Sequence, residues 1–197
     1  MNNTIEKIKQ QVINCKKCKL SETRTNSVPG KGNFKADVIL IGEAPGRNED
    51  KNGEPFVGAA GKRLEDALKK TGIERKDVYI TNVVKCRPPS NRVPIDEERK
   101  ACQDYIENEI KIIQPKIICI LGNTAFNSML GGGEITKFRG KTVRKNNQIY
   151  FLTIHPAATI YNQKLIQVLD EDIERLFSLV DNLKKSLEVS IDIEISS

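Results

Sequence analysis

Four cysteines are spaced so that their thiolates could share one metal site. Cys15 and Cys18 form a C-x-x-C pair, and Cys86 and Cys102 follow far downstream. In a chain expected in the cytoplasm, such cysteines favour metal ligation over disulfides, with unrelated cysteines as the alternative. Four thiolates suit zinc or an iron–sulfur cluster. The spacing departs from the paired C-x-x-C motifs of zinc ribbons, which weakens the zinc interpretation without excluding it.

The fifth cysteine and the loop around Cys86 differ in character. Cys119 lies in the apolar run KIICILG and is expected to be a small core residue. Cys86 lies in KCRPPSNRVP, residues 85–94, a basic stretch stiffened by prolines. A metal ligand at Cys86 would pin this loop.

These residues must be positioned by a regular framework of strands and helices. Near-continuous Val, Ile and Leu in four short runs are typical of strands covered on both faces. The expected strands are residues 37–43, 77–84, 116–122 and 149–155, and the expected helices are 61–72, 94–113, 123–130 and 163–187. This alternation predicts an α/β fold, a three-layer α/β/α sandwich with a central, mainly parallel four-stranded sheet.

The unusual residues follow the ends of the expected strands. Ligands of parallel sheets bind outside the carboxyl ends of the strands. The segments at these ends are GEAPG (42–46), TNVVKCRPP (81–89), GN (122–123) and HPAA (155–158). We therefore expect them to meet at one rim of the sheet.

The order of these segments resembles the family-4 uracil-DNA glycosylases, the iron–sulfur type of many thermophilic archaea and bacteria. The resemblance rests on GEAPGRNED, FVGAAGKRL, TNVVKCRPPSNRVP, HPAA and the four spaced cysteines, and it covers about residues 10–180. It implies a three-layer α/β/α enzyme that hydrolyses the N-glycosidic bond of deoxyuridine in DNA, releasing free uracil and leaving an abasic site. It also implies a structural 4Fe–4S cluster on Cys15, Cys18, Cys86 and Cys102.

Three residues fit the handling of a flipped base, which must be held in a snug pocket and read along its polar edge. Phe56 is the candidate for stacking on the base, and Asn82 can accept from uracil N3–H and donate to O4. His155, the only histidine, can donate to uracil O2 as charge builds there. Without the resemblance, these residues would be interpreted as a core aromatic, a turn residue and a structural histidine.

The loop that begins at Gly42 departs from the better-known family-1 enzymes. Their water-supporting aspartate aligns with Ala44, and their thymine-blocking aromatic aligns with Gly46. The backbone from Gly42 to Gly46 can still approach a ligand closely. We assign Glu43 to organising the pocket or water, and Glu49 to excluding the C5 methyl group.

Two basic segments are candidates for contacting DNA phosphates. Lys85, Arg87 and Arg92 lie in the stiff loop, where little entropy would be lost on docking. Residues 135–169 carry no acid, so they could form a positive face or a merely solvated surface. Their basic residues are Lys137, Arg139, Lys141, Arg144, Lys145 and Lys164.

Length and composition set the remaining expectations. The 197 residues suggest one domain over 1–187 and a tail over 188–197. The alternating tail fits an edge strand, a segment that binds a replication or repair partner, or disorder. We find no apolar run long enough for a bilayer and no signal-peptide pattern, so we expect a cytoplasmic monomer without membrane contact.

Two other functions compete with a monofunctional glycosylase. A non-catalytic nucleic-acid-binding module with a structural zinc would use the cysteines and the basic loop, but would leave Phe56, Asn82 and His155 without a shared purpose. An enzyme that captures uracil DNA covalently would need an extra loop histidine, which the sequence does not contain.

Overall fold

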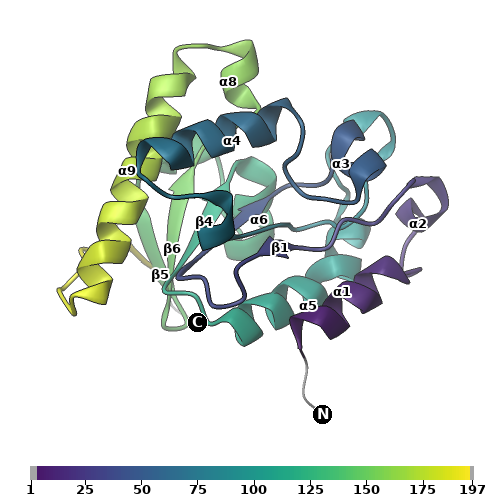
Figure 1. The fold of residues 1–197 in the computed structure, drawn as a ribbon, viewed down its shortest axis with the longest axis horizontal. Coiled ribbons are helices and arrows are strands. Elements are labelled where there is room, and N and C mark those ends of the chain that lie inside the picture. The colour runs from purple at the N-terminus through teal and green to yellow at the C-terminus, as the bar shows by residue number, and fades with distance from the viewer. Residues whose placement is uncertain (1–3, 196–197) are drawn as a thin grey trace.

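The computed structural model describes residues 4–195, which form a mixed α/β fold (Figure 1). Seven strands within this range pair in the order β1-β3-β2-β4-β6-β5-β7. The central strands β3, β2, β4 and β6 are mutually parallel, whereas β1 and β5 run antiparallel to β3 and β6. The strands are β1 (Lys31–Gly32), β2 (Val38–Gly42), β3 (Tyr79–Asn82), β4 (Ile117–Leu121), β5 (Thr142–Lys145), β6 (Gln148–Thr153) and β7 (Ile193–Ile195).

The central strands are apolar throughout because both of their faces are covered. Successive side chains of a strand point to opposite faces of the sheet. In β2, Ile39 and Ile41 enter one buried cluster, and Val38 and Leu40 enter the other. The sheet therefore separates two hydrophobic cores.

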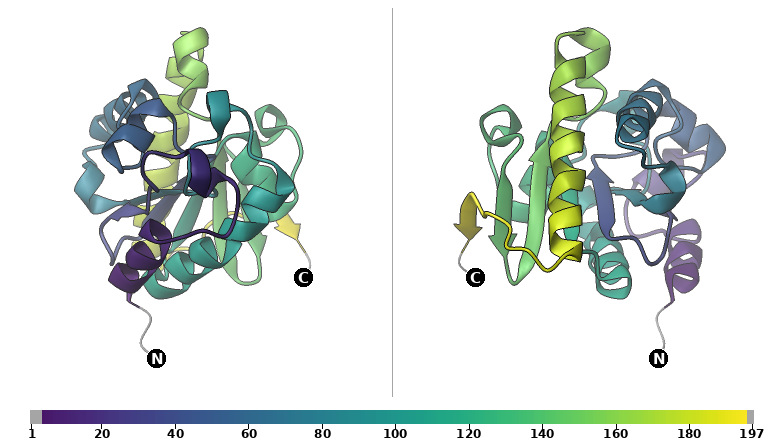
Figure 2. Two further views of the ribbon diagram at one scale, coloured as in Figure 1. Left: turned by 90° about the vertical axis from the view of Figure 1, so that its right-hand side faces the viewer. Right: turned by 60° about the vertical axis from the view of Figure 1, so that its left-hand side comes forward.

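Helices cover both faces of the sheet (Figures 1 and 2). Buried residues of α1, α5 and α6 belong to one core, and those of α4 and α9 to the other. The α-helices are α1 (Ile5–Ile13), α2 (Leu20–Thr23), α3 (Arg47–Asn52), α4 (Ala59–Lys70), α5 (Asp96–Ile113), α6 (Asn123–Leu130), α7 (Ile135–Phe138), α8 (Ala158–Tyr161) and α9 (Leu165–Lys184), and the 3₁₀ turns are η1 (Arg75–Asp77) and η2 (Pro89–Asn91). No helix in the described range is long and apolar enough to cross a membrane.

The predicted strands correspond to β2, β3, β4 and β6, but the prediction of a four-stranded sheet is wrong. The described chain adds β1, β5 and β7. These strands are short and contain charged residues, as in KG, TVRK and IEI, so they lack the apolar runs that mark buried strands. The sheet is consequently mixed toward its edges.

The C-terminal segment supplies an edge strand, one of the three alternatives for the tail (Figure 2). β7 runs parallel to β5, with Ile193 opposite Val143. The Asp192 carboxylate accepts hydrogen bonds from the backbone N–H and the hydroxyl of Thr142, at 2.7 and 2.9 Å. Residues 196 and 197 of the predicted tail lie outside the described residues, and partner binding by the tail stays a prediction.

Candidate active site

A cavity of about 250 Å³ opens where the sequence placed the rim. It lies at the carboxyl ends of β2 and β3 and beside the segment that follows β6, as expected for a ligand site of a parallel sheet. The predicted site residues that line it are Glu43, Ala44, Glu49, Phe56, Asn82, Arg92 and His155. Segments from five parts of the chain thus meet at one hollow.

Asn82 brings an unused hydrogen-bond acceptor to the cavity. It is the last residue of β3 and is only 2% exposed. Among the described residues, its Oδ1 atom has no hydrogen-bond partner. Buried polar atoms without partners are rare in folded proteins, so this oxygen is suited to a donor on a ligand.

Phe56 and Asn82 converge over Gly42, the last residue of β2. A Cβ atom at Gly42 would lie 2.6 Å from both the Asn82 Oδ1 and the Phe56 Cζ. The Phe56 ring also lies 5.6 Å from the His155 ring, centroid to centroid, at an interplanar angle of 32°. The absence of a side chain at Gly42 therefore lets the aromatic ring and the amide occupy the same end of the cavity.

His155 is held as a neutral ring. Burial lowers the pKa of His155 from the usual 6.5 to about 4. Its Nδ1 atom accepts a hydrogen bond from the backbone N–H of Ala157 at 3.2 Å, which assigns the proton to Nε2. Gly122, with φ +88°, allows the close approach, because a Cβ there would lie 2.8 Å from the His155 Cβ. The side chain is thus a neutral N–H donor.

Glu43 is fixed by a residue that the sequence analysis missed. The hydroxyl of Thr124, in the first turn of α6, donates a hydrogen bond to Glu43 Oε2. The bond joins the ends of β2 and β4, and Glu43 lines the cavity beside it. Such a carboxylate can accept a hydrogen bond from a water molecule through its remaining lone pairs.

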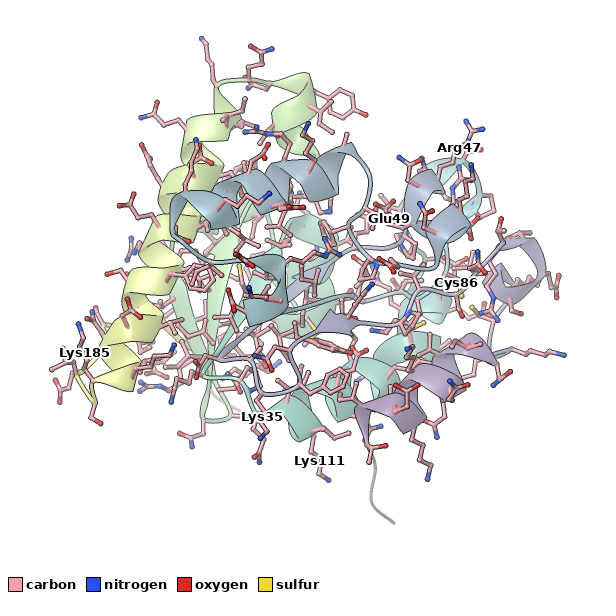
Figure 3. The ribbon with its side chains drawn as sticks, viewed as in Figure 1. Lys35, Arg47, Glu49, Cys86, Lys111 and Lys185 are labelled. Carbon is pink, nitrogen blue, oxygen red and sulfur yellow. The ribbon has the colours of Figure 1, made fainter. Side chains whose placement is uncertain are left out.

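Glu49, in α3 close to Arg47 (Figure 3), organises the loop that carries Phe56. Its Oε1 accepts from the backbone N–H groups of Val57 and Gly58 at 2.9 and 2.7 Å, and its Oε2 accepts from that of Gly46 at 3.1 Å. A Cβ at Gly46 would lie 2.8 Å from Oε2. The carboxylate therefore stands directly beside Gly46, the position that the sequence analysis aligned with the aromatic residue of family-1 enzymes.

The four spaced cysteines lie on the same side of the sheet. Cys86 and Cys102 belong to the core beneath α1 and α5, and Cys15 and Cys18 pack against that core. Cys119 is fully buried in the opposite core, which confirms its interpretation as a core residue. The fold thus separates the four candidate ligands from the fifth cysteine.

Hydrogen-bond donors contact the sulfurs of Cys86 and Cys102. Arg24 donates to the Cys86 Sγ at 2.9 Å, and the backbone N–H of Lys85 lies 3.5 Å from the Cys102 Sγ. Donors of this kind stabilise metal-bound thiolates. In the part of the chain that the structure describes, no group of three or more His, Cys, Asp or Glu side chains has an arrangement that could hold a metal ion.

The prediction that Lys85 contacts DNA is wrong. Its side chain is 1% exposed, and its Nζ atom donates to Glu109 Oε2 at 2.8 Å and to Thr81 Oγ1 at 2.5 Å. Glu109 projects from α5 and is equally buried. Lys85 therefore ties the loop to α5 and is not accessible to a phosphate.

Arg87 and Arg92 remain near the surface but already have protein partners. Arg87 donates through Nε to the Asn91 side-chain oxygen at 2.7 Å. Arg92 forms a bidentate ion pair with Glu98 at 2.6 and 2.9 Å, while its side chain stays 42% exposed and lines the cavity. These contacts pre-order the loop at the cavity mouth.

The acid-free segment 135–169 is not a free positive face. Arg139 pairs with the buried Asp172, and Arg144 pairs with Glu194 at 3.2 Å. Lys137 pairs with Glu134 at 2.8 Å. Acids from neighbouring segments thus neutralise half of its basic residues in space.

Comparison with known proteins decides the family. The family model described as the Uracil DNA glycosylase superfamily matches residues 29–177. The chain belongs to this superfamily. Its match extends from just before β1 into α9 and so includes the cavity and its lining.

Similar superfamily members are type-4 uracil-DNA glycosylases. The chain is 49% identical to the one from Sulfurisphaera tokodaii, over 93% of this chain and 88% of the relative. It is 45% identical to that of Saccharolobus solfataricus, over 88% and 85%, and 42% identical to that of Archaeoglobus fulgidus, over 93% and 97%. The resemblance noted in the sequence is confirmed.

In this superfamily member, sequence reasoning missed Thr124, which bonds to the cavity residue Glu43, and Tyr161, which lines the cavity. Thr124 lies two residues after Gly122, the residue that follows β4, and its position in GNTA was the available signal. Tyr161, in α8, is 90% exposed and lines the cavity mouth. Its signal is weaker, since one tyrosine six residues after His155 carries no motif.

Proposed function

We propose that this protein is a DNA repair glycosylase that flips uracil out of DNA and hydrolyses its N-glycosidic bond, leaving an abasic site and free uracil. The observation that carries the proposal is the buried, unpartnered Oδ1 of Asn82 at the wall of the cavity. Uracil N3–H is a donor that matches this acceptor, and the Asn82 amino group can donate to O4. Superfamily membership and the type-4 relatives support the same activity.

Leaving-group stabilisation is the main chemical task of the site. When the bond between C1′ and uracil N1 breaks, its electron pair moves onto the uracil ring and builds negative charge at O2. The Nε2–H of His155 is the donor for that oxygen, and it is in place before the reaction begins. A water molecule then adds to C1′ and releases one proton to solvent, and the uracil anion takes up one proton, so that the products are the abasic site and free uracil.

Glu43 and Glu49 take separate roles in this scheme. Glu43, held by Thr124, orders the water or the pocket wall. Glu49 stands beside Gly46, and its carboxylate is fixed by three backbone N–H groups. A rigid carboxylate there would meet the C5 methyl group of thymine and exclude it, while Ala44 and Gly42 leave space for the ring.

Cys15, Cys18, Cys86 and Cys102 would hold a 4Fe–4S cluster. Their placement on one core and the donors to the Cys86 and Cys102 sulfurs support this proposal. Each thiolate of a 4Fe–4S cluster binds a different iron, so the four sulfurs need not converge on a single ion. When bound, the cluster supplies cross-linking rather than redox chemistry, because hydrolysis transfers no electrons. It would join the N-terminal segment, the loop after β3 and α5.

Arg87 and Arg92 would then meet DNA phosphates from a loop that is already ordered. Their hydrogen bonds to Asn91 and Glu98 fix the loop, and the Cys86 ligand would fix its start. A pre-ordered loop loses less conformational entropy on binding. DNA that contains uracil is accordingly the expected partner.

Incubation with a single-uracil oligonucleotide, followed by hot alkali, tests the proposal. Strand cleavage at the uracil position is expected, because alkali breaks DNA at an abasic site. An oligonucleotide with thymine at the same position should stay intact. Binding without cleavage would contradict the proposal and favour the non-catalytic module with a structural zinc.

A further inference from the structure

The backbone at Phe56 adopts a conformation that an aromatic residue disfavours. Its φ is +53°, in the left-handed region. Its carbonyl group approaches α4 so closely that a Cβ at Gly61 would lie 1.8 Å from the oxygen. Such a conformation persists only where the surroundings hold it in place.

Arg75 stabilises this backbone conformation of Phe56 from outside the cavity. Its guanidinium group donates to the carbonyl oxygen of Phe56 at 2.8 Å and also to the carbonyl oxygen of Pro55. Glu49 holds the same segment through the N–H groups of Val57 and Gly58. The guanidinium group of Arg75 and the carboxylate of Glu49 therefore form hydrogen bonds with the backbone of four consecutive residues, 55–58.

The location of Arg75 links the two sides of the base pocket. It begins η1, which leads into β3 and so to Asn82 at the end of that strand. In the described chain it forms no ion pair within 4.0 Å, and it lines a groove separate from the cavity. The planar guanidinium can donate to two carbonyl oxygens at once, which a lysine ammonium cannot reproduce with the same geometry.

We propose that Arg75 is a positioning residue, which holds the Phe56 ring where it stacks on the extruded base. The inference rests on the proposed glycosylase function. Arg75 acts only through the backbone of residues 55 and 56, so its effect on the reaction requires the Phe56 ring. This requirement distinguishes positioning from a general contribution to folding.

A double-mutant cycle measures that requirement. Arg75→Met should slow single-turnover uracil release roughly ten- to a hundredfold, the scale of a small displacement of a positioning group. In a Phe56→Ala background, the same substitution should cause no further slowing. Lys76→Met, at the exposed neighbour in η1, is the matched control and should leave the rate unchanged. An unchanged rate in Arg75→Met, or equal slowing in both backgrounds, would overturn the proposal.

Amide hydrogen exchange gives a readout that does not need catalysis. Val57 and Gly58 should exchange at least about tenfold faster in Arg75→Met but not in Lys76→Met, because the segment opens more often. Unchanged exchange would overturn the proposal even if the protein were active. If the wild-type protein released no uracil, the glycosylase function would fail, while exchange would still show whether Arg75 holds the segment. Should Arg75→Met not fold, Arg75→Lys is expected to show both effects in weaker form, and wild-type behaviour of that variant would contradict the proposal.

Discussion

The Nδ1 atom of His155 accepts a hydrogen bond from the backbone N–H of Ala157, two residues along the chain, at 3.2 Å. A protonated imidazole could not accept this bond, since both of its nitrogens would be donors. The contact and the burial of the ring therefore favour the same neutral form. In the proposed mechanism, a neutral ring would present Nε2–H to the uracil oxygen without introducing a buried charge.

A titration of His155 tests this arrangement. The pKa in the folded protein is expected at about 4 instead of 6.5. Because the unfolded chain binds the proton more readily, the free energy of unfolding should fall as the pH drops from 6.5 to about 4. The chain has one histidine, so its NMR signals need no assignment. A midpoint near 6.5, or a proton on Nδ1, would contradict the neutral-donor role.

Gly42→Ala should damage catalysis more than folding. The added methyl group would meet the Phe56 ring and the Asn82 Oδ1 at 2.6 Å, so both must move. We expect uracil excision to fall by about a hundredfold or more, with a stability loss of about 1–3 kcal/mol. Gly133→Ala is the control, because nothing lies within 4 Å of a Cβ there. Near-normal excision by Gly42→Ala would show that this crowding does not govern the pocket.

Lys85→Met should destabilise the protein without changing its phosphate contacts. The substitution leaves the buried Glu109 without an opposite charge, although Tyr79 and Thr81 still donate hydrogen bonds to it, and this loss costs about 3 kcal/mol. The salt dependence of DNA binding by the folded fraction should stay unchanged. Arg87→Ala should show the opposite pattern, with a log–log salt slope smaller by about one. A lowered slope in Lys85→Met would mean that Lys85 reaches the DNA after all.

We predict that the protein is coloured, because the four cysteines would hold an iron–sulfur cluster. Protein with an intact 4Fe–4S cluster should absorb visible light broadly near about 400 nm. Cys86→Ala should lose this absorption and lower stability, whereas Cys119→Ala, also buried but in the opposite core, should retain it. One zinc and no iron by metal analysis would exclude the cluster.

The sequence indicated the parts of the fold that depend on local composition. Continuous apolar runs revealed the four central strands, since burial on both faces leaves a clear pattern. The strand-end rule then placed Asn82 and His155 at one cavity, as the structure has them. Outer strands such as β5, which lies between β6 and the edge strand β7, escaped prediction because TVRK, with two charged residues, carries too weak a pattern.

Contacts between segments that are distant in the sequence could not be predicted from the sequence alone. Thr124 meets Glu43 across 81 residues, and nothing in either local motif indicates the partner. The basic loop around Lys85 predicted that this residue binds phosphate, but Lys85 is buried in an ion pair with Glu109 of α5. Positive charge in the sequence therefore does not by itself predict an accessible cation.

The measurement that tests base reading by Asn82 most directly is the free base released by wild-type protein and Asn82→Asp. Matched oligonucleotides would carry one uracil or one cytosine, and the released base would be quantified by mass spectrometry. The carboxyl group of the Asn82→Asp variant lacks the amino donor for uracil O4. It can accept a hydrogen bond from the cytosine amino group and, when protonated, donate one to cytosine N3. We predict that wild-type protein releases only uracil, and that Asn82→Asp loses most uracil release and gains weak cytosine release, favoured at lower pH. Near wild-type uracil release by Asn82→Asp would contradict the assignment of Asn82 as the residue that reads the base.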